Sequence, residues 1–474
     1  MKLRKNLKLI LKVSLSFILL AIVLFFAREY ISNIFLKISL TGINPAGKND
    51  RVLVIAPHCD DEVLGSAEFI KKTLKNGGSA KVVLITNGDG FKSAVQFDYL
   101  NIHPKPADYI KFGYDRQKES LQALNRLGLS KDNVIFLGYP DGGIANLLYA
   151  NWDKSNPYTS SDTATDKTPY NNSFTKGALY CGENLETDLE KIITDYKPNY
   201  IIYPHPNDRH PDHMAANVFT KYAITKLNYK PDKELLYLVH RGDWPTPLRR
   251  DTNMYLVPPA KLANTGTNWF ALDLNNTDIS EKSEVINYYK TQIKLLAPLM
   301  TAFERKNELF GEYSNITLHS TGKNDDSIAP NDSNIAIINP KQDTLGLEIA
   351  KGANILEIHA EKSNINNLHI FAVLDEEFDS YINYNLNIIY FKGAEIKRLN
   401  ILFKDNKVFK LSTDMKSMVI DNNIVNKSKG NVLHFILPDR LNGEFDHVYI
   451  NMNSSVGDKI INRTAWRMIV NPGK

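Results

Sequence analysis

Between residues 51 and 239, short apolar runs alternate with longer segments of helical periodicity. The first unit sets the pattern. An apolar run over 51–56 leads into a polar cluster, and a helical stretch from about Glu62 to Asn76 then ends at Gly77-Gly78. The same order recurs, which predicts strands at 81–86, 133–137, 200–203 and 234–239 and helices at 115–127, 184–196 and 211–227. Such alternation predicts an α/β fold with a parallel sheet covered by helices on both faces.

Polar clusters follow several of the predicted strands, and two of them are dense in metal-ligating side chains. The first is Pro57-His58-Cys59-Asp60-Asp61-Glu62, and the second runs from His205 to the segment His210-Pro211-Asp212-His213. Four of the 11 histidines of the chain fall in these two windows. In parallel α/β sheets, ligands bind where the chain leaves the carboxyl ends of the strands. We therefore expect the two clusters to converge on one crevice.

Three of these side chains are the predicted metal ligands. His58 and Asp61 stand three residues apart at a helix start, so both can point to one side, and His213 can reach the same point from across the crevice. Two imidazoles and a carboxylate, with a fourth position left for water, are typical of a catalytic zinc site. Iron(II), cobalt or nickel would accept the same donors.

The other side chains of the two clusters have predicted roles around that metal. Asp60 is expected to act as general base, and His210 to stabilise an oxyanion or protonate a leaving group. Asp212 and Glu62 are expected to support the ligands from behind. Taken singly, each carboxylate could be a helix N-cap. Two such clusters at one edge of the predicted sheet favour the metal site.

Five motifs in order resemble those of the PIG-L or LmbE-like zinc-dependent de-N-acetylases. They are residues 57–62, Thr86-Asn87-Gly88-Asp89-Gly90, the helix segment from Arg116 to Glu119, the segment 137–142, and residues 210–213. The resemblance covers roughly residues 50–310. It implies a Rossmann-like fold, zinc held by His58, Asp61 and His213, Asp60 as general base, and His210 beside the oxyanion or the leaving amine. It also implies that Arg116 and Asp141 contact the sugar; a surface or interdomain salt bridge is the alternative for that pair.

The two cysteines, Cys59 and Cys181, are too few for a disulfide framework. Cys59 stands inside the first motif, where the family most often has proline. Because an extended turn would point its side chain away from its neighbours, we expect a buried, inert thiol. Whether Cys59 and Cys181 form a disulfide stays open.

The N-terminal segment has the pattern of a membrane-directing sequence. Basic residues at positions 2, 4, 5 and 8 precede an apolar run from Leu9 to Ala27 that is interrupted by Lys12. About 20 apolar residues cross a bilayer, which predicts a single-pass transmembrane helix. The basic flank predicts a cytoplasmic N-terminus and an extracytoplasmic catalytic domain. Secretion after signal cleavage is the alternative, although no Ala-x-Ala pattern follows the apolar run.

Beyond about residue 316 the sequence changes character. A linker composition over 316–334 gives way to short alternating segments at 355–360, 368–373, 386–391, 399–403, 433–437 and 447–452, which predict an all-β, sandwich-like domain. Glycan binding and inert spacing are both open as its role. The predicted organisation is a membrane anchor or signal segment (1–28), a linker (29–49), a deacetylase domain (50–315), a linker (316–334) and the β domain (335–474).

Two further segments of the catalytic region carry expectations. Residues 150–180 form a polar, tyrosine-containing insertion, which we expect to line the substrate groove unless it is a simple surface loop. Trp152, Tyr158 and Tyr170 are its candidates for stacking on a sugar. A helical pattern over about 280–307 predicts one packing helix.

Composition narrows the function further. The 57 Lys and Arg residues exceed the 53 Asp and Glu residues by only four, and the excess lies at the extreme N-terminus, which disfavours a nucleic-acid partner. We expect a zinc-dependent hydrolase that removes the N-acetyl group of an N-acetylglucosamine-type sugar in a cell-surface glycan or glycolipid, releasing acetate. The alternatives are a non-catalytic polysaccharide-binding surface protein and a deacetylase of a small thiol-cofactor precursor or a chito-oligosaccharide. The sequence leaves the oligomeric state open.

Overall fold

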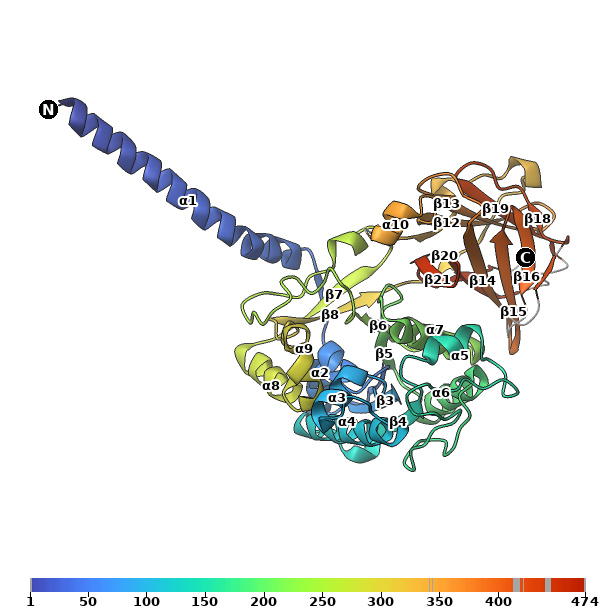
Figure 1. Cartoon of the computed structure of the whole chain (residues 1–474), viewed down its shortest axis with the longest axis horizontal. Coiled ribbons are helices and arrows are strands. Elements are labelled where there is room, and N and C mark those ends of the chain that lie inside the picture. Colours follow the sequence, from blue (N-terminus) through green and yellow to red (C-terminus); the bar gives the residue numbers. More distant parts are fainter. Residues whose placement is uncertain are drawn as a thin grey trace.

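The computed structural model describes residues 2–340, 342, 344–411, 418–420, 422–439 and 445–472. The chain has three parts: a long N-terminal helix, an α/β domain and a C-terminal domain of strands (Figure 1). The structure confirms the predicted α/β unit with a parallel sheet and the predicted β-rich C-terminal region.

An eight-stranded sheet in the order β1-β7-β8-β6-β5-β2-β3-β4 forms the centre of the α/β domain. Five neighbouring strands run parallel: β2 (Arg51–Ala56), β3 (Ser79–Thr86), β4 (Val134–Tyr139), β5 (Tyr200–Pro204) and β6 (Lys233–Tyr237). β8 (Asn307–Glu312) is antiparallel to β6 and to β7 (Asn268–Asp273), and the short β1 (Thr41–Gly42) pairs with β7. The sequence pattern predicted the parallel strands but not this antiparallel edge.

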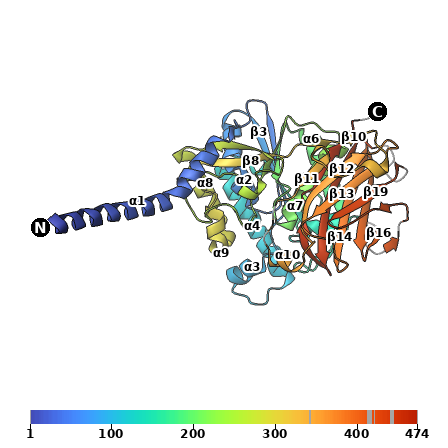
Figure 2. The same ribbon diagram turned by 90° about the horizontal axis from the view of Figure 1, so that it is seen from above.

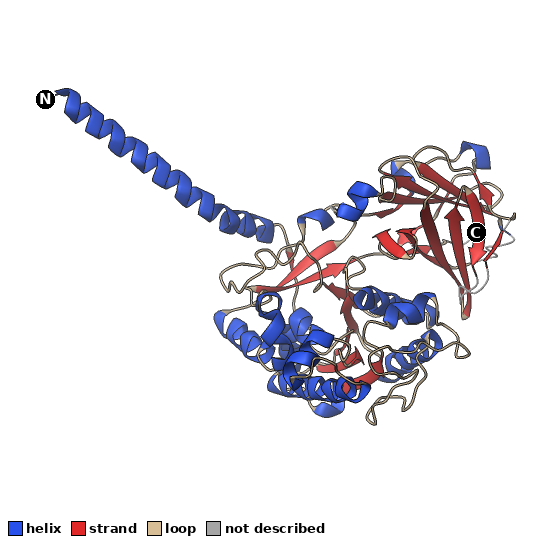
Figure 3. Ribbon diagram, viewed as in Figure 1, coloured by secondary structure: helices blue, strands red, loops and turns tan. Residues whose placement is uncertain are grey.

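Helices cover both faces of this sheet (Figure 3). One face carries α2 (Asp61–Lys75), α4 (Pro106–Arg126) and α8 (Asn276–Ile286), with α3 (Lys92–Tyr99) and α9 (Lys290–Thr301) packed against α4 and α8; the other carries α5 (Ile144–Tyr149), α6 (Gly182–Tyr196) and α7 (Pro211–Lys226). Side chains of β2 alternate between two cores, because Val52 and Val54 pack with the α2 face whereas Leu53 and Ile55 pack with the α7 face. Burial on both faces explains why β2 is a continuous apolar run.

Two helices differ from their predicted bounds. α4 begins at Pro106, nine residues before the predicted start, where proline suits the first turn and the Asp108 carboxylate accepts from the Lys105 amide at 2.8 Å. The single helix predicted over about 280–307 is two helices, α8 and α9, followed by β8. They are separated at residues 287–289, where Asn287 caps the end of α8 and Tyr289 precedes α9 with non-helical backbone angles.

A buried carboxylate stabilises a kink in α2. Ser66 has non-helical backbone angles (φ −151°, ψ 23°), which interrupts the helix hydrogen bonds just after it. The backbone amides of Glu68 and Phe69 instead donate to the carboxylate of Glu308 on β8, each at 2.9 Å. Lys282 of α8, fully buried, donates to the same carboxylate at 2.7 Å. Glu308 therefore joins α2, α8 and the antiparallel edge of the sheet.

Replacing Glu308 by alanine is expected to lower the free energy of unfolding by about 3–5 kcal/mol, because a buried ammonium and two backbone amides lose their acceptor. Urea or thermal unfolding of the full chain measures this. The double variant Glu308→Ala/Lys282→Met should be less destabilised than Glu308→Ala alone, since it leaves no buried ammonium without its carboxylate partner. Equal stability of the two variants would contradict this reading.

The C-terminal domain consists of two sheets that share one apolar core. The first contains β10 (His319–Ser320), β11 (Ile335–Ile338), β12 (Ile355–Lys362), β13 (Leu368–Leu374), β18 (Val425–Asn426) and β19 (Val432–Leu437). The second contains β9 (Ile316–Thr317), β14 (Ile382–Lys392), β15 (Glu395–Lys404), β16 (Lys407–Leu411), β17 (Met418–Ile420), β20 (His447–Val456), β21 (Lys459–Arg463) and β22 (Arg467–Val470). One short helix, α10 (Leu345–Ile349), lies against β21.

The two domains are joined by a continuous apolar interface. The core on the α7 face of the α/β domain includes Phe391 and Trp466 of the β domain. Tyr222 of α7 packs edge-on against Phe391 with ring centroids 5.2 Å apart, and the Trp466 indole donates to the Tyr149 hydroxyl at 3.1 Å. An interface of buried aromatic rings fixes the position of one domain on the other.

The N-terminal helix α1 (Lys2–Ile38) projects away from both domains (Figures 1 and 2). Near its end, the Asn33 side chain donates to the carbonyl and accepts from the amide of Tyr255, both at 2.8 Å. Within the described residues, no helix has an apolar stretch long enough to cross a bilayer. This finding does not support the transmembrane helix predicted over 9–27; Lys12, Ser14 and Ser16 lower the hydropathy of that run.

Candidate active site

The two predicted clusters meet at the carboxyl ends of β2 and β5. Asp61 Oδ2 lies 3.1 Å from His58 Nδ1 and 3.0 Å from His213 Nε2. The same two imidazole nitrogens are 3.3 Å apart. The structure therefore brings the three predicted metal ligands together, with β2 and α2 positioning His58 and Asp61, and the first turn of α7 positioning His213.

The chemistry of this cluster fits a divalent metal ion. Asp61 and His213 are fully buried, and Asp61 Oδ1 has no hydrogen-bond partner among the described residues. Although burial disfavours the charged carboxylate, the two histidines hold the pKa of Asp61 well below its usual range. Burial also opposes protonation of His213, but Asp208 and Asp61 raise its pKa to about 9. Hydrogen-bonding protons therefore join the imidazole nitrogens to the carboxylate, and a divalent cation could bind the same atoms in place of those protons.

A fourth histidine, His240, belongs to the same cluster. Its ligand atom and those of His58, Asp61 and His213 all lie within 4.8 Å of one another. Burial, together with the neighbouring His213, lowers the pKa of His240 to about 3, so its ring is neutral and able to bind a metal. His240 directly follows the strand predicted at 234–239. The sheet-edge rule applied to that strand is the signal that would have found it.

Two aspartates hold the cluster from behind. Asp208 Oδ2 lies 3.2 Å from His213 Nδ1 and accepts from the amides of Val239 and His240, each at 3.0 Å. This orienting role of Asp208 was not predicted. Asp212, which was predicted there, lies 3.4 Å from His58 Nε2 and accepts from the Gly142 amide at 2.7 Å. Asp212 therefore connects the cluster to the loop after β4.

Asp60 is held next to the metal cluster in a strained conformation. Its φ of +140° is rarely adopted by residues other than glycine. Its Oδ2 accepts from Arg116 Nη2 at 3.1 Å, and Arg116 also donates to the carbonyls of Gly88 and Cys59. Burial, against the opposing charge of Arg116, raises the pKa of Asp60 to about 8. Arg116 is thus the partner that positions Asp60.

Glu62 supports Asp60 from the protein interior. Its carboxylate accepts from the Asp60 amide at 2.9 Å, from Ser120 Oγ at 2.8 Å and from Tyr289 Oη at 2.6 Å. Three hydrogen bonds satisfy this buried group, so it takes no direct part in the metal cluster.

A cavity of about 380 Å³ opens onto these residues. It is lined by His58, Asp60, Gly90, Phe91, Arg116, Asp141, Gly142, Asp162, His210, His240, Gln292 and Leu296. Asp141 Oδ1 lies 3.2 Å from His58 Nε2, and Oδ2 accepts from the Gly90 amide at 2.7 Å. Arg116 and Asp141, predicted to contact the sugar, are therefore both in the cavity wall and both hydrogen-bonded to protein.

His210 borders the cavity beside His58, with ring centroids 4.8 Å apart. Its Nδ1 accepts from the Asp212 amide at 3.2 Å. Burial and the nearby His58 and His213 lower the pKa of His210 to about 4. The ring is therefore neutral near pH 7, and its proton is on Nε2 as a hydrogen-bond donor.

A family model described as "PIG-L: GlcNAc-PI de-N-acetylase" matches residues 53–224. These residues form a PIG-L family domain. All five motifs that suggested the resemblance lie within the matched range. The match confirms the resemblance and the predicted enzyme class, an N-deacetylase hydrolase. No curated protein sequence matches the chain.

Several solved structures are similar to part of the chain. The conserved protein TT1542 from Thermus thermophilus is 19% identical, over 53% of this chain and 84% of that one (TM-score 0.33). The N,N'-diacetylchitobiose deacetylase of Pyrococcus horikoshii is 17% identical, over 60% and 92% (TM-score 0.35). A deacetylase of the teicoplanin biosynthesis pathway is 16% identical, over 55% and 96% (TM-score 0.36).

The insertion after β4 contributes an acidic side chain to the wall of the cavity, and no aromatic ring that could stack on a sugar. Trp152 stacks on Phe219 with parallel rings 5.8 Å apart and lies beneath the Arg398 guanidinium. Tyr170 is 2% exposed and donates its hydroxyl to Asp89. Both side chains are packed within protein, which contradicts their expected stacking on a sugar. Tyr158 is half-buried beside Gly143, outside the cavity lining, and Asp162 is the residue of this insertion that lines the cavity.

Both cysteines of the PIG-L domain are free and buried. Burial raises the pKa of the Cys59 thiol, which keeps it in the unreactive protonated form. Cys59 is therefore a packing residue at the base of the motif, as predicted.

His205, in the second motif window, lies outside the metal cluster. It is fully buried, donates from Nε2 to Thr267 Oγ1 at 3.0 Å and accepts at Nδ1 from the Asn207 amide at 3.1 Å. Its ring stacks on Trp269 with centroids 5.1 Å apart. Burial lowers the pKa of His205 to about 3. The residue is a neutral structural histidine beneath the site.

Acid should therefore destabilise the PIG-L domain through His205. Because the pKa of His205 is lowered from 6.5 on folding, its stabilisation is present above pH 6.5 and is lost as the pH falls toward 3. Between pH 7.5 and pH 5 we expect a loss of about 2 kcal/mol in the free energy of unfolding from this group. Urea unfolding across this range should show a flatter pH dependence for His205→Gln. His103→Gln, at an exposed site, should behave as the wild type; an unchanged slope in His205→Gln would contradict this assignment.

Proposed function

We propose that the PIG-L domain is a zinc-dependent N-deacetylase that acts on an N-acetylglucosamine-type sugar in a cell-surface glycan or glycolipid, releasing acetate and a free amine. One observation carries the proposal. The strained, buried Asp60 and the neutral His210 border the same cavity as His58 of the His58, Asp61 and His213 cluster. A proton acceptor and a hydrogen-bond donor for the oxyanion, beside metal ligands, are the parts that amide hydrolysis needs.

Each of these residues has a task in that reaction. Zinc held by His58, Asp61 and His213 would supply a Lewis acid. Asp60, with Oδ2 held by Arg116, would accept a proton from the attacking water. His210 would donate a hydrogen bond from Nε2 to the developing oxyanion, and Asp60 would pass the proton it took from water to the leaving nitrogen. Hydrolysis needs the carboxylate form of Asp60, which a bound cation close by would favour.

The rest of the cavity wall suits an amino sugar. Asp141, Asp162 and Gln292 offer hydrogen-bonding groups for hydroxyls, and Phe91 and Leu296 offer apolar surface for the acetyl methyl or a sugar face. In most small-molecule sites, a small number of polar groups fix the orientation of the ligand within a partly apolar wall.

Acetate release by the full chain tests the proposal. N-acetylated oligosaccharides, lipid-linked N-acetyl sugars and matched O-acetylated sugars would be supplied with zinc, and acetate and free amine would be quantified. We expect both products, in equal amounts, from N-acetylated substrates only, and neither from a His58→Ala variant. Acetate released from O-acetylated sugars alone, without any free amine, would overturn the proposal. Turnover of only a small thiol-linked amide would replace the substrate class, and absence of both turnover and bound metal would favour a polysaccharide-binding protein.

We also infer that the enzyme works outside the cytoplasm. The support is the basic flank followed by an apolar run at the N-terminus, the pattern that exported proteins carry. Protease added to intact cells should degrade the PIG-L domain, and N-terminal sequencing of the mature chain should show whether residues 1–28 are removed. Full protection in intact cells, with degradation after lysis, would refute an extracytoplasmic location.

A further inference from the structure

One histidine of the metal cluster is outside the set of three predicted ligands. His240 lies in the loop after β6, beyond the residues 53–224 that the family model matches. Its ligand atom and those of the three predicted ligands all lie within 4.8 Å of one another. Its ring meets the ring of His213 edge-on, with centroids 4.7 Å apart. His240 therefore adds a third imidazole to the cluster.

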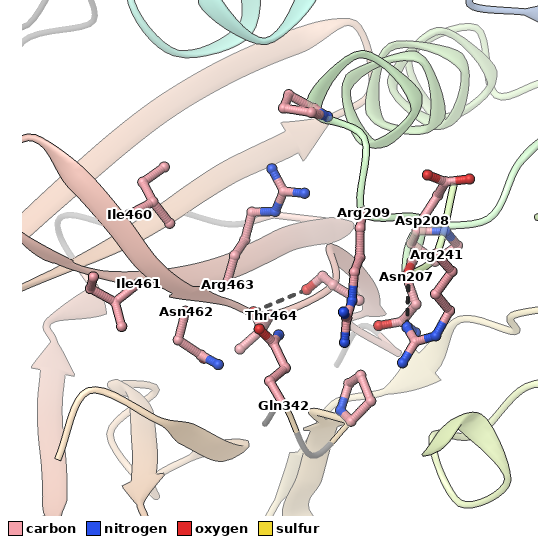
Figure 4. Close-up of a pocket in the computed structure, with 14 residues that line it drawn as sticks. Asn207, Asp208, Arg209, Arg241, Gln342, Ile460, Ile461, Asn462, Arg463 and Thr464 are labelled. Atoms are coloured by element: carbon pink, nitrogen blue, oxygen red, sulfur yellow. Dashed lines mark hydrogen bonds between the residues drawn. The ribbon is translucent and has the colours of Figure 1, made fainter. Parts of the chain in front are cut away.

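The backbone of His240 is fixed by hydrogen bonds to the loop after β5. The His240 amide donates to the Asp208 carboxylate at 3.0 Å, and the His240 carbonyl accepts from the Arg209 amide at 2.8 Å. The guanidinium of the next residue, Arg241, donates to the Asn207 carbonyl at 3.2 Å (Figure 4). Residues 207–209 thus hold both the main chain of His240 and the residue that follows it.

The same carboxylate joins His240 to a predicted ligand. Asp208 Oδ2, which accepts from the His240 amide, also lies 3.2 Å from His213 Nδ1. Metal-binding histidines usually have a carboxylate or carbonyl on the ring nitrogen that faces away from the metal, which leaves the other nitrogen for the cation. Asp208 therefore sets the position of His213 and of His240 together.

The ring of His240, in contrast to its backbone, has no hydrogen-bond partner among the residues that the structure describes. His205 is different, because both of its ring nitrogens are hydrogen-bonded. The His240 ring borders the catalytic cavity, as His58 does. A fixed backbone that presents an unpaired imidazole to a group of metal ligands is the preorganisation that a further ligand requires.

We propose that His240 is a fourth side-chain ligand of the catalytic metal, in addition to the three predicted ligands. Three imidazoles and a carboxylate then hold the cation, one ligand more than the three protein ligands usual at a catalytic zinc. Such a donor set favours zinc over magnesium or calcium, which prefer oxygen ligands. The inference rests on the proposed function for the presence of the metal and concerns only how the protein holds it.

Zinc affinity of the full chain, measured by competition with a chromophoric chelator, tests this role without turnover. His240→Phe keeps a ring beside His213 and removes both ring nitrogens. Because those nitrogens have no partner among the described residues, the variant should fold. We expect its Kd for zinc to rise about 100-fold, since losing a ligand costs at least as much as losing a group that supports one. His240→Asn gives the same comparison if His240→Phe does not fold.

X-ray absorption at the zinc edge counts the ligands directly. We expect three imidazoles around zinc in the wild type and two in His240→Phe. His103→Gln, which removes an exposed histidine, should match the wild type in both measurements.

Equal zinc affinity of His240→Phe and the wild type, or only two imidazoles around zinc in the wild type, would overturn the proposal. A fall in kcat with unchanged zinc affinity would also overturn it and make His240 a substrate contact instead. The proposed function fails separately. Zinc held by three imidazoles without acetate release would support the ligand set and overturn the hydrolase.

Discussion

Replacing Asp60 by asparagine is expected to lower kcat/KM for acetate release by about 10³-fold, because the reaction loses its proton acceptor. The side-chain size and shape are nearly unchanged, so the replacement adds no steric demand to the unusual backbone conformation of this position. The variant should therefore fold and keep its metal. The variant and the wild type are compared by acetate release under saturating zinc, and circular dichroism and metal analysis of the same preparations check folding and metal content.

The matched control is Asp132→Asn, which removes a carboxylate from an exposed turn away from the cavity and should retain wild-type activity. If Asp60→Asn retained more than about a tenth of the activity, general-base catalysis by Asp60 would be refuted. Loss of metal together with activity in Asp60→Asn would instead identify Asp60 as a ligand.

Removal of the metal is expected to abolish activity, and about one zinc per chain should restore it. The cation must displace protons from the two histidines of the His58, Asp61 and His213 cluster. Burial opposes protonation of His58, but hydrogen bonds to Asp141, Asp212 and Asp61 outweigh it and raise the pKa of His58 well above its usual value. The pKa of His213 is raised to about 9. Zinc binding near pH 7 should therefore release about two protons, and affinity should rise with pH up to about 9. Titration calorimetry in buffers of different ionisation enthalpy counts these protons.

Asp61→Ala should eliminate stoichiometric zinc. A second acidic group, formed by Glu68, Asp278 and Glu281, provides the control because it could also attract a cation. Glu281→Gln should leave zinc content and activity unchanged. Zinc lost from Glu281→Gln but retained by Asp61→Ala would place the ion in the wrong part of the molecule for the proposed chemistry.

The hydrophobic pattern of the sequence, together with the rule that ligands bind at the carboxyl ends of parallel strands, was enough to predict the centre of the site. The apolar run of β2 and the helix periodicity after it placed His58 and Asp61 at a strand end, and the parallel arrangement brought His213 to the same edge. His240 was missed because a single histidine after a strand has no spacing partner in the sequence. Its approach to His213 depends on β6 lying beside β5.

Packing between distant segments was not predictable in the same way. Trp152 lies in a polar insertion, where an exposed aromatic ring is a reasonable expectation. Its actual neighbours are Phe219 on α7 and Arg398 in the β domain, more than 60 and more than 240 residues further along the chain.

The shared aromatic core between the domains has a consequence for how the enzyme would select glycans. Since Tyr222 and Phe391 pack in one core, the position of the β domain relative to the catalytic cavity is constant. A long polymer bound in the cavity would then meet the β domain always at the same distance from its acetamide group. Selectivity would then reside in the shape of the polymer chain as much as in the identity of any one sugar.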